Sequence, residues 1–586
     1  MKCLIYLILC CTEWALASTV YFSAHLTWAN HSVAGVQRPV ILTNGQYPGP
    51  ELRLNQGDNV IFDVYNDCPF NVTIHFHGIE QIGTPWSDGV PGLSQRPVES
   101  NSAFRYRWKA DQYGAYFYHA HHRGQIEDGL YGPIYIAPSS SVTKPFSLIS
   151  SNFFDQEAMK FAEITTSPLI LSDWRLVTSE QVWHTEEAAN VDAFCANALL
   201  INGKGSVTCL PQDLINQLTT PEQKLVLGNE TLTDFACFPP NIGQGGPFAQ
   251  NLSALLPTMF YGCTPSQGPQ HVIYADPLRR YISLDLTSAA GVIDLVFSID
   301  EHDMWIYAVD GRYIQPVKVN ALTIPIGNRY SVLVPVNKTP GDYTVRLVSG
   351  SIQQILNTTG VLHYQAPDFL RRPSRPWITM TGTNATANTV FFDVSKIVPY
   401  PAIAPSTDVA ATYILTIRRF GASYRWTLGN SSYALELEES QPLLFNQTAI
   451  PSDLIVRNNN NTWVDLIIQV DSPAQPAHPI HKHSNKHFAI GQGLGTFTWS
   501  SVAEAMQSIP ESFNLINPPF KDTTPTPAST TGATWLALRY HVENPGAFLL
   551  HCHVQIHQSG GMALALLDGV DEWPDIPENY LNDSGF

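Results

Sequence analysis

The sequence predicts an all-β protein of three tandem β-sandwich domains, and three observations support this fold class. The chain has 586 residues, too many for one hydrophobic core when a domain takes roughly 100–200 residues. Apolar residues make up 44% and charged residues only 14%, with 43 prolines and 38 glycines, which is typical of compact β-rich domains rather than disorder or coiled coil. Short segments of alternating polarity, broken by turn residues, recur along the whole chain.

The first 17 residues have the pattern of a secretory signal peptide. Lys2 precedes an apolar run at residues 4–11, and Ala15-Leu16-Ala17 is a small-residue cleavage pattern. The run is shorter than the roughly 20 residues that span a membrane. We therefore expect residues 1–17 to be removed, and the protein to be secreted, extracellular or cell-wall associated, without a membrane partner. Frequent Asn-x-Ser/Thr sequons predict a glycoprotein: examples are Asn71, Asn229, Asn251, Asn337, Asn357, Asn384, Asn430, Asn446 and Asn582.

The net charge excludes some binding partners, and the cysteine count limits the number of disulfides. The formal net charge is −18, and loss of Lys2 and Glu13 with the signal peptide leaves it unchanged. Such an acidic protein is not expected to bind nucleic acid or anionic membranes through a basic patch. If Cys552 binds a metal, the other cysteines form at most two disulfides and leave one thiol, with the connectivity open. The cysteines outside the signal peptide are Cys68, Cys195, Cys209, Cys237, Cys263 and Cys552.

Residues 18–145 form the first predicted domain, and its strands carry paired histidines. Residues i and i+2 of a strand point to the same face. His75 with His77, and His119 with His121, therefore each present two imidazoles in one direction. The segments with the β-branched and aromatic content of strands are residues 60–65, 71–77 and 115–121.

Residues 146–365 form the second predicted domain, in which no paired histidines occur. Its strand-like segments are residues 281–286, 292–297 and 330–335. Residues 206–270 are rich in glycine and proline and contain three cysteines. We interpret them as a long insertion stapled by disulfide.

Residues 366–586 form the third predicted domain, which begins with a linker at 366–388. Its strand-like segments are residues 463–470 and 546–551, and histidine clusters follow each of them. Three all-β units with weakly similar strands suggest tandem repeats of one sandwich. Metal ligands are expected only in the first and last.

Ten of the 19 histidines gather in four clusters, and Cys552 lies within the last one. Imidazole-rich sites with one thiolate favour copper, whereas the four-ligand cysteine or cysteine/histidine sets of structural zinc sites are missing from the sequence. Cys552 can bind one metal through sulfur while its two neighbours bind another, which gives electrons a short covalent path. The clustered histidines are His75 and His77; His119 and His121; His478, His481 and His483; and His551, His553 and His557.

These four clusters resemble the four signatures of three-domain multicopper oxidases, the group of laccases, ascorbate oxidases and ferroxidases. The text from His77 to Gln81 and on to Gly92 further resembles ascomycete fungal members linked to spore pigment. The resemblance implies three cupredoxin-like Greek-key β-sandwich domains. It also implies a laccase-like, monomeric enzyme that oxidises small phenolic or naphtholic compounds one electron at a time and reduces dioxygen to water, plausible in fungal pigment or secondary metabolism. A ferroxidase and, less so, a non-catalytic copper protein remain alternatives.

The resemblance further implies four copper ions and assigns their ligands. The type 1 copper would take His478, Cys552 and His557, with Met562 as axial ligand. The type 2 copper would take His75 and His481. The two type 3 ions would take His77, His119 and His553, and His121, His483 and His551. An axial thioether predicts a low to moderate potential, which favours easily oxidised donors such as catechols, naphthols, aminophenols or hydroquinones.

One carboxylate is a candidate for a role in the reaction. Asp88 resembles the family's carboxylate near the trinuclear cluster, so we place it with Cys552 as catalytic, to orient water or relay protons. The alternative is a turn-capping aspartate before Gly89. A second acidic residue is often found between the last copper histidines, but this chain has Gln555 there and Gln558 after His557. The proton route therefore stays open.

Several other polar residues receive simpler interpretations. His122 would point to the opposite strand face from His121, so we expect it beside the ligands or in solvent. His487 is interpreted as structural, and His302 as a surface residue. Asp173 lies near the position where iron-oxidising members carry a substrate carboxylate.

Overall fold

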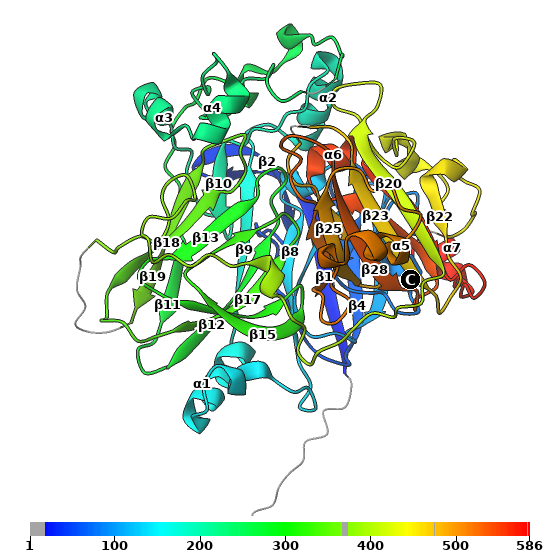
Figure 1. Ribbon diagram of the computed structural model, residues 1–586, viewed down its shortest axis with the longest axis horizontal. Coiled ribbons are helices and arrows are strands. Elements are labelled where there is room, and N and C mark those ends of the chain that lie inside the picture. The colour runs from blue at the N-terminus through cyan, green and yellow to red at the C-terminus, as the bar shows by residue number, and fades with distance from the viewer. Residues whose placement is uncertain (1–17, 245, 366–372, 474, 583) are drawn as a thin grey trace, which may run out of the picture.

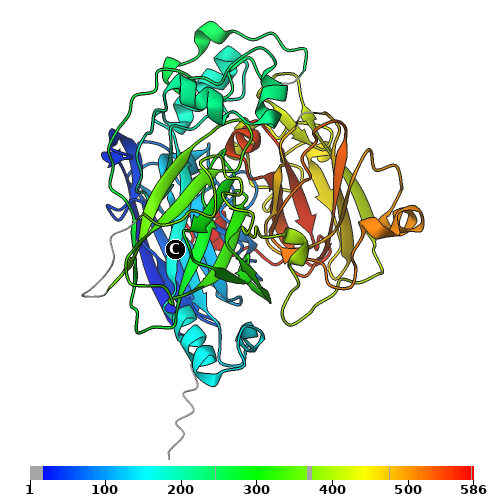
Figure 2. The same cartoon turned by 60° about the vertical axis from the view of Figure 1, so that its left-hand side comes forward.

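A computed structural model describes residues 18–244, 246–365, 373–473, 475–582 and 584–586. The predicted signal peptide lies outside these residues, as does the 366–372 part of the predicted linker. Figures 1 and 2 show three groups of strands packed together, with most of the helices at the periphery. The predicted all-β class with three sandwiches is confirmed: the strands form six sheets, two from each third of the chain.

The first pair of sheets is built from residues 19–137. One sheet has the order β2 (Val36–Thr43), β1 (Thr19–Val33), β4 (Asn59–Asn66) and β6 (Ser102–Lys109). The other has the order β3 (Leu52–Asn55), β8 (Tyr131–Ala137), β7 (Gly114–Ala120) and β5 (Ile74–His77).

The second pair of sheets is built from residues 167–364. One sheet has the order β10 (Ala198–Ile201), β9 (Ser167–Trp174), β12 (Tyr281–Ser288), β17 (Arg329–Pro335), β14 (Met304–Val309) and β15 (Arg312–Val319). The other has the order β11 (Val272–Ala275), β19 (Asn357–Tyr364), β18 (Asp342–Ser349), β13 (Leu295–Ile299) and β16 (Ala321–Ile324).

The third pair of sheets is built from residues 411–568. One sheet has the order β21 (Trp426–Leu428), β20 (Ala411–Arg419), β23 (Trp463–Val470), β28 (Thr534–His541), β25 (His487–Leu494) and β26 (Phe520–Lys521). The other has the order β22 (Ile455–Arg457), β30 (Ala563–Asp568), β29 (Gly546–Cys552), β24 (Pro479–Lys482) and β27 (Thr523–Pro525). Among the described residues no strand crosses the predicted boundaries near 145 and 365, which themselves stay predictions.

A recurring parallel pairing relates the three sandwiches. In one sheet of each pair the parallel neighbours are β1 with β4, β9 with β12, and β20 with β23. In the other sheet they are β3 with β8, β11 with β19, and β22 with β30. All other pairings between these strands are antiparallel. The same mixed topology three times over is what a tandem repeat of one sandwich predicts.

Helices are short and lie in the connections between strands. They are α1 (Phe153–Ile164), α2 (Ser179–Ala189), α3 (Gln212–Leu218), α4 (Pro221–Leu227), α5 (Val502–Ser508), α6 (Gln555–Ser559) and α7 (Glu578–Leu581). The 3-10 helices are η1 (Pro85–Ser87), η2 (Gln125–Asp128), η3 (Pro145–Leu148), η4 (Leu252–Ala254), η5 (Pro257–Met259), η6 (Val394–Lys396), η7 (Leu435–Glu439), η8 (Ser452–Leu454) and η9 (Pro510–Ser512). Within the described ranges, none of the helices is both long and apolar enough to cross a membrane.

The predicted disulfide-stapled insertion is confirmed at residues 206–270, which include α3 and α4 at one end of the molecule (Figure 1). Cys209 is bonded to Cys263, and Cys237 is bonded to Cys195 just before the insertion. Cys68 is the thiol left over, and it is buried.

The surface position expected for His302 is wrong. Its side chain is buried, and its two ring nitrogens lie 2.8 Å from the Asp300 carbonyl oxygen and 2.8 Å from the Tyr364 hydroxyl. Burial lowers the pKa of His302 to about 4. Because both nitrogens have partners and the ring stays neutral, burial costs little.

Candidate metal centres

Strand register places the predicted histidines opposite one another. In the antiparallel pair β5 and β7, His75 lies directly across from His119. In the pair β24 and β29, His481 lies directly across from His551. Because β-strand side chains alternate, the histidines two residues further along project to the same side. Two short strand pairs, one from each end of the chain, thus carry the four clusters.

The two strand pairs face each other and enclose a cage of histidines. The rings of His75 and His483 stack with centroids 3.8 Å apart, and those of His77 and His481 stack at the same distance. All the rings of the cage are buried. The cage consists of His75, His77, His119, His121, His481, His483, His551 and His553.

Backbone carbonyls fix the orientation of four of these rings. The Nδ1 atoms of His75 and His119 lie 2.7 and 2.8 Å from the carbonyl oxygens of Asp88 and Ala120. Those of His481 and His551 lie 2.9 Å from the carbonyl oxygens of Asp522 and Cys552, respectively. A carbonyl only accepts, so each Nδ1 carries the proton and each Nε2 turns its lone pair into the cage.

The inward nitrogens have the properties of metal ligands. The Nε2 atoms of His75, His119, His121 and His481 are buried and find no hydrogen-bond partner within the described residues. Such atoms are rare in folded proteins unless something else satisfies them. Burial also lowers the pKa, to about 3 for His551 and well below the usual value for His77, His119, His121, His481, His483 and His553. Metal binding requires the neutral imidazole that this burial favours.

Three donor atoms form a second, smaller site around Cys552, which we call the sulfur site. Its Sγ lies 3.8 Å from Nδ1 of His478 and 3.6 Å from Nδ1 of His557, and the two nitrogens are 3.3 Å apart. Burial raises the pKa of the Cys552 thiol and lowers that of His478 to about 3. Two imidazoles and one sulfur in a triangle fit the trigonal set of a blue-copper centre.

A tight chain reversal brings Met562 back to this site. Helix α6 holds His557, whose carbonyl oxygen accepts a hydrogen bond from the Met562 amide at 2.9 Å. The Met562 carbonyl in turn accepts from the Cys552 amide at 3.1 Å. Met562 is fully buried, and its side chain packs in the same hydrophobic core as Cys552.

Groups of donors that approach one another closely match the two proposed kinds of site. The ligand atoms of His478, Cys552 and His557 lie within 4.8 Å of one another. In the cage the same holds for His75 with His77 and His119; for His75 with His481 and His483; and for His121 with His483 and His551. The Nε2 of His553 lies 3.2 Å from Nδ1 of His77. The donor set therefore fits copper at both places.

Asp88 lies against the cage. Its Oδ2 accepts a hydrogen bond from Nδ1 of His483 at 2.9 Å. Its Oδ1 lies 3.4 Å from Nδ1 of His75 and has no hydrogen-bond partner in the described part of the chain. The next residue, Gly89, has φ +82°, and a Cβ there would meet the Ile74 carbonyl oxygen at 1.9 Å, so only glycine lets this turn approach β5. Asp88 also ends η1, so it both caps a turn and orients a ring.

Asp522 lies against the cage and was not predicted from the sequence. Its carboxylate is fully buried, 3.4 Å from Nε2 of His77, and it binds Arg329 at 2.5 and 2.7 Å and Lys486 at 2.5 Å. Burial alone would raise its pKa, but the two cations hold the pKa of Asp522 well below its usual range. No histidine pattern surrounds residues 520–523 in the sequence. The one signal that could have pointed to Asp522 is an aspartate between two short strands, β26 and β27.

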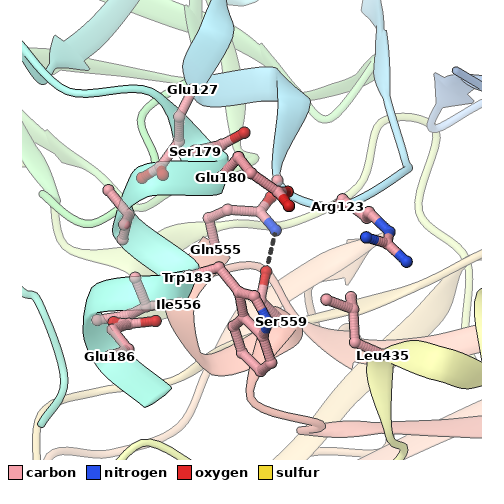
Figure 3. A pocket seen from close by; sticks show the side chains of 12 residues that line it. Arg123, Glu127, Ser179, Glu180, Trp183, Glu186, Leu435, Gln555, Ile556 and Ser559 are labelled. Atoms are coloured by element: carbon pink, nitrogen blue, oxygen red, sulfur yellow. Dashed lines mark hydrogen bonds between the residues drawn. The ribbon is translucent and has the colours of Figure 1, made fainter. Parts of the chain in front are cut away.

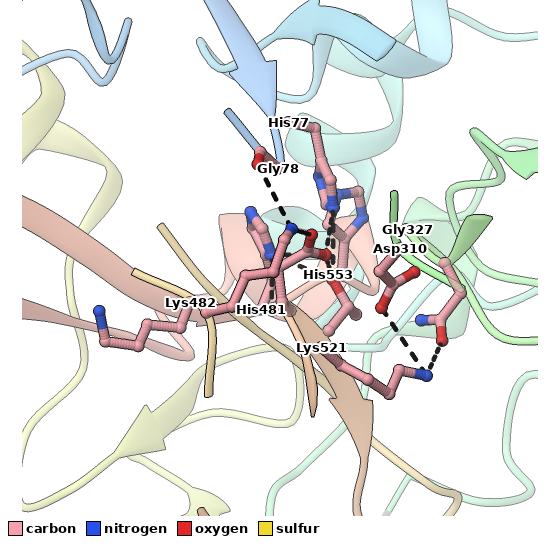
Figure 4. Close-up of polar contacts among 12 residues, drawn as sticks. His77, Gly78, Asp310, Gly327, His481, Lys482, Lys521 and His553 are labelled. Atoms are coloured by element: carbon pink, nitrogen blue, oxygen red, sulfur yellow. Dashed lines mark hydrogen bonds and ion pairs between the residues drawn. The ribbon is translucent and has the colours of Figure 1, made fainter. Parts of the chain in front are cut away.

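Around Asp522 a buried ionic network links the second and third sandwiches. Figure 4 shows His77 beside His553, and Lys521 extending toward Asp310. The Lys521 ammonium lies 3.8 Å from the Asp310 carboxylate. Arg329, which binds Asp522, comes from β17 of the second sandwich. The cage is thus supported by charges from a sandwich that supplies none of its histidines.

Three further residues that were considered in the sequence are all buried. His122 is buried, with Nε2 3.1 Å from a carboxylate oxygen of Glu439, so it lies beside the ligands and not in solvent. His487 is buried and hydrogen-bonded to Thr524 at 2.9 Å, in agreement with a structural role. The Asp173 carboxylate accepts three backbone N–H groups at 2.8–2.9 Å, and the residue is buried. Asp173 therefore cannot face a substrate.

A small hollow lies beside α6, between it and α2 (Figure 3). Its lining includes Glu127, Glu180 and Glu186 as well as Gln555. The room for water is only about 10 Å³, no more than one water molecule needs. As it stands this hollow is too small and too acidic to hold a phenol.

Comparisons with known proteins agree with these features. Sequence models described as multicopper oxidase match residues 25–141, 165–367 and 426–572. Laccase abr2 of Aspergillus fumigatus is 41% identical over 569 residues, which is 96% of this chain and 96% of the relative. Multicopper oxidase MCE of Talaromyces pinophilus is 40% identical over 566 residues, 95% of this chain and 93% of the relative.

Two solved structures share the fold. The laccase from Botrytis aclada has a TM-score of 0.71 at 22% identity, covering 97% of this chain and 90% of that chain. Fet3p, a multicopper oxidase that functions in iron import, has a TM-score of 0.66 at 19% identity, covering 96% and 94%. At these identities the likeness speaks for the fold alone, and it confirms the cupredoxin-like sandwiches that the sequence predicted.

Proposed function

Because the chain belongs to the multicopper oxidase family, and is thus a copper-dependent oxidoreductase, we propose that it is a secreted laccase-like enzyme. It takes single electrons from phenolic or naphtholic compounds and uses them to reduce dioxygen to water. One observation carries this proposal: a buried triangle of two imidazoles and a thiol is joined through Cys552 to a cage of eight histidines whose free nitrogens converge.

Four copper ions are assigned to these donors. The type 1 ion would take His478, Cys552 and His557, with Met562 as a weak fourth ligand. The type 2 ion would take His75 and His481. The type 3 ions would take His77, His119 and His553, and His121, His483 and His551. Bound copper supplies reversible one-electron chemistry at each position.

The protein supplies the connection between the two sites. Cys552 stands between His551 and His553 in the chain, so the sulfur site and the cage share three consecutive residues. The Nδ1–H of His551 also donates to the Cys552 carbonyl at 2.9 Å, which adds a hydrogen-bonded route beside the covalent one. Donors that give one electron at a time can thus serve a reaction that consumes four.

Asp88 has two roles in this proposal. Its Oδ2 holds the His483 ring in one orientation, as carboxylates behind metal-bound histidines do. Its Oδ1 has no partner among the described residues and can hold a proton or a water inside the cage.

A fungal pigment or secondary-metabolite pathway is the proposed setting. The similarity to laccase abr2 supports a laccase-like donor, and the buried thioether of Met562 supports an easily oxidised one. A ferroxidase is the alternative, but the carboxylate expected to face iron, Asp173, is held by three backbone amides.

The test compares donors on the copper-loaded glycoprotein. Oxygen uptake is measured with a naphthol, a simple phenol, ascorbate, bilirubin and Fe(II) under one set of conditions. We expect turnover with the naphthol to exceed turnover with Fe(II). Faster turnover of Fe(II) would favour the ferroxidase, and a blue protein that takes up no oxygen with any donor would favour a copper protein without oxygen chemistry.

A further inference from the structure

Reduction of dioxygen in the buried cage requires protons as well as electrons. The balance is O2 + 4 e⁻ + 4 H⁺ → 2 H2O, and phenols release their protons at the surface of the protein. The cage histidines are all buried. The positions between His553 and His557 and directly after His557 hold Gln555 and Gln558, whose amides do not donate protons in this pH range. Another group must carry protons inward.

A cavity beside the cage meets this need. Its polar lining consists of His121, Gln558, Tyr433 and Glu438, and the rest of its wall is apolar. It has about 20 Å³ of room for water, enough for one molecule. The Tyr433 hydroxyl is buried and finds no partner in the described residues, so a water in this cavity is what would satisfy it. The amide Nε2 of Gln558 lies 3.4 Å from Nδ1 of His121.

Glu438 is the acidic group of this cavity. It lies in η7, with 13% of its side chain exposed, and its Oε2 accepts the Arg123 amide at 3.2 Å. The other carboxylates near the cage are committed elsewhere: Asp522 to Arg329 and Lys486, and Glu127 to Arg175 at 3.0 Å. Asp88 faces the cage from a turn, is fully buried, and bonds to the cage histidine His483 rather than to an exposed group.

Solvent reaches Glu438 through its neighbour. Glu439 is 43% exposed, and its Oε1 lies 3.1 Å from Nε2 of His122. The same ring nitrogen lies 3.8 Å from Oε2 of Glu438. A line of polar atoms therefore runs from the surface through Glu439 and His122 to Glu438, and then across the cavity to the cage.

The electrostatics of the site agree with a reversible acid. Burial raises the pKa of Glu438 to about 7, against the opposing effects of His122 and Arg123. Glu439 adds negative charge, and Tyr433 faces Glu438 from the cavity wall. Near neutral pH both forms of this carboxyl are populated, which suits repeated proton transfer.

We propose that Glu438 supplies protons to the cage through one water in the cavity beside His121. The Glu438 O–H bond breaks as its proton passes to that water, which passes a proton on to the oxygen being reduced. The carboxylate then regains a proton from solvent by way of Glu439. Four such transfers accompany the four electrons from four donor molecules. This assignment rests on the proposed function, because it presupposes dioxygen reduction in the cage.

The test is Glu438→Gln, with Glu436→Gln as the matched control from the exposed side of the same η7 element. Each protein is reduced by a naphthol without oxygen and then mixed with oxygen, and recovery of the blue colour is followed. For E438Q we expect unchanged copper content and unchanged anaerobic reduction, but recovery slowed by about 100-fold or more with a larger solvent deuterium isotope effect. E436Q should match the unaltered protein throughout.

Two further readouts separate proton supply from a structural role. Recovery in the unaltered protein should slow as pH rises through about 7, and E438Q should lack this limb of the pH profile. The infrared difference between the two resting proteins should contain a protonated-carboxyl band that fades over the same pH range.

Two outcomes would overturn the assignment of Glu438, and a third would overturn the proposed function. Recovery in E438Q as fast as in E436Q would overturn the assignment. If E438Q fails to hold copper, the deciding variant is Glu438→Asp, which shortens the side chain by one methylene and so displaces the carboxyl group. A normal rate of recovery with an unchanged pH profile in this variant would overturn the assignment. If the unaltered protein is reduced by no donor, the proposed function fails instead.

Discussion

Single hydrogen bonds behind the histidine rings decide which nitrogen of each ring faces the interior. The carbonyls of Asp88, Ala120 and Cys552 each hold one Nδ1–H, so the opposite nitrogen is left bare before any ion arrives. Such prearrangement removes the cost of choosing a tautomer when metal binds. For His119 and His551 burial completes it, because it lowers the pKa of both rings and keeps them neutral.

Copper retention should depend on pH differently at the two sites. Burial lowers the pKa of His551 to about 3, and that of His121 and His481 well below the usual value, so protons should compete with copper at these ligands only as pH falls toward about 3. Burial raises the pKa of the Cys552 thiol, so binding there displaces one proton at every working pH. Affinity at the sulfur site should therefore fall by about tenfold per pH unit of acidification.

Titration with a copper chelator between neutral and mildly acidic pH checks this. Blue absorbance should disappear before the cage loses copper, as counted by total copper content. Simultaneous loss from both sites, or earlier loss from the cage, would contradict the burial argument.

The predictability of residues follows from how local their contacts are. The paired histidines could be recognised because a strand repeats every two residues, and Cys552 because its neighbours are histidines. Asp522 could not, because its contacts with Arg329 and His77 join residues 193 and 445 positions away in the chain. The burial of His302 was not predictable for the same reason, because its partner Tyr364 lies 62 residues further on.

Strand register is the feature at the element scale that assembles the site. A slip by one residue in β24 against β29 would turn His481 and His551 to opposite faces. The predicted strand at 60–65 is observed as β4, and that at 115–121 as β7. The strand predicted at 292–297 begins only at Leu295, because the amides of Val292 and Ile293 bond to the Asp173 carboxylate. That contact, formed over more than a hundred residues, is invisible to a pattern of alternation.

The insertion at 206–270 is an element whose stability rests on its disulfides. Cys209 and Cys263 close a loop with a sequence separation of 54 residues, which in the chain-entropy account contributes up to about 4 kcal/mol. In Cys209→Ser/Cys263→Ser we expect faster proteolysis and hydrogen exchange confined to this insertion, with normal copper content. Loss of copper in that variant would show instead that the insertion, whose Phe235 and Phe260 pack in the same core as Cys552, supports the metal centres.

Assembly of the whole molecule depends on charges buried where the sandwiches meet. Arg329 from the second sandwich binds Asp522 from the third, and both are fully buried. Removing one partner of such a pair leaves the other charge unpaired in a low-dielectric interior, which lowers the free energy of unfolding by about 3–5 kcal/mol. The sequence predicted three sandwiches, but not that the second one would support a cage formed by the other two, because nothing local records how domains dock.

Arg329→Met should therefore lower the melting temperature and reduce copper in the cage, because Asp522 shifts against His77. Arg105→Met is the matched control, since its pair with Asp63 is partly exposed and such pairs contribute about 0–1 kcal/mol. Calorimetry and copper analysis check both. An Arg329 variant as stable and as copper-rich as the Arg105 variant would contradict a role for this pair in holding the sandwiches together.

Cys552→Ser tests most directly whether one residue joins the electron entry site to the cage. Copper content, blue colour and oxygen uptake with a naphthol are measured together on this variant and on the unaltered protein. We predict loss of the blue colour and of naphthol oxidation, with the cage copper largely retained. Naphthol oxidation that persists without the sulfur would contradict the bridge.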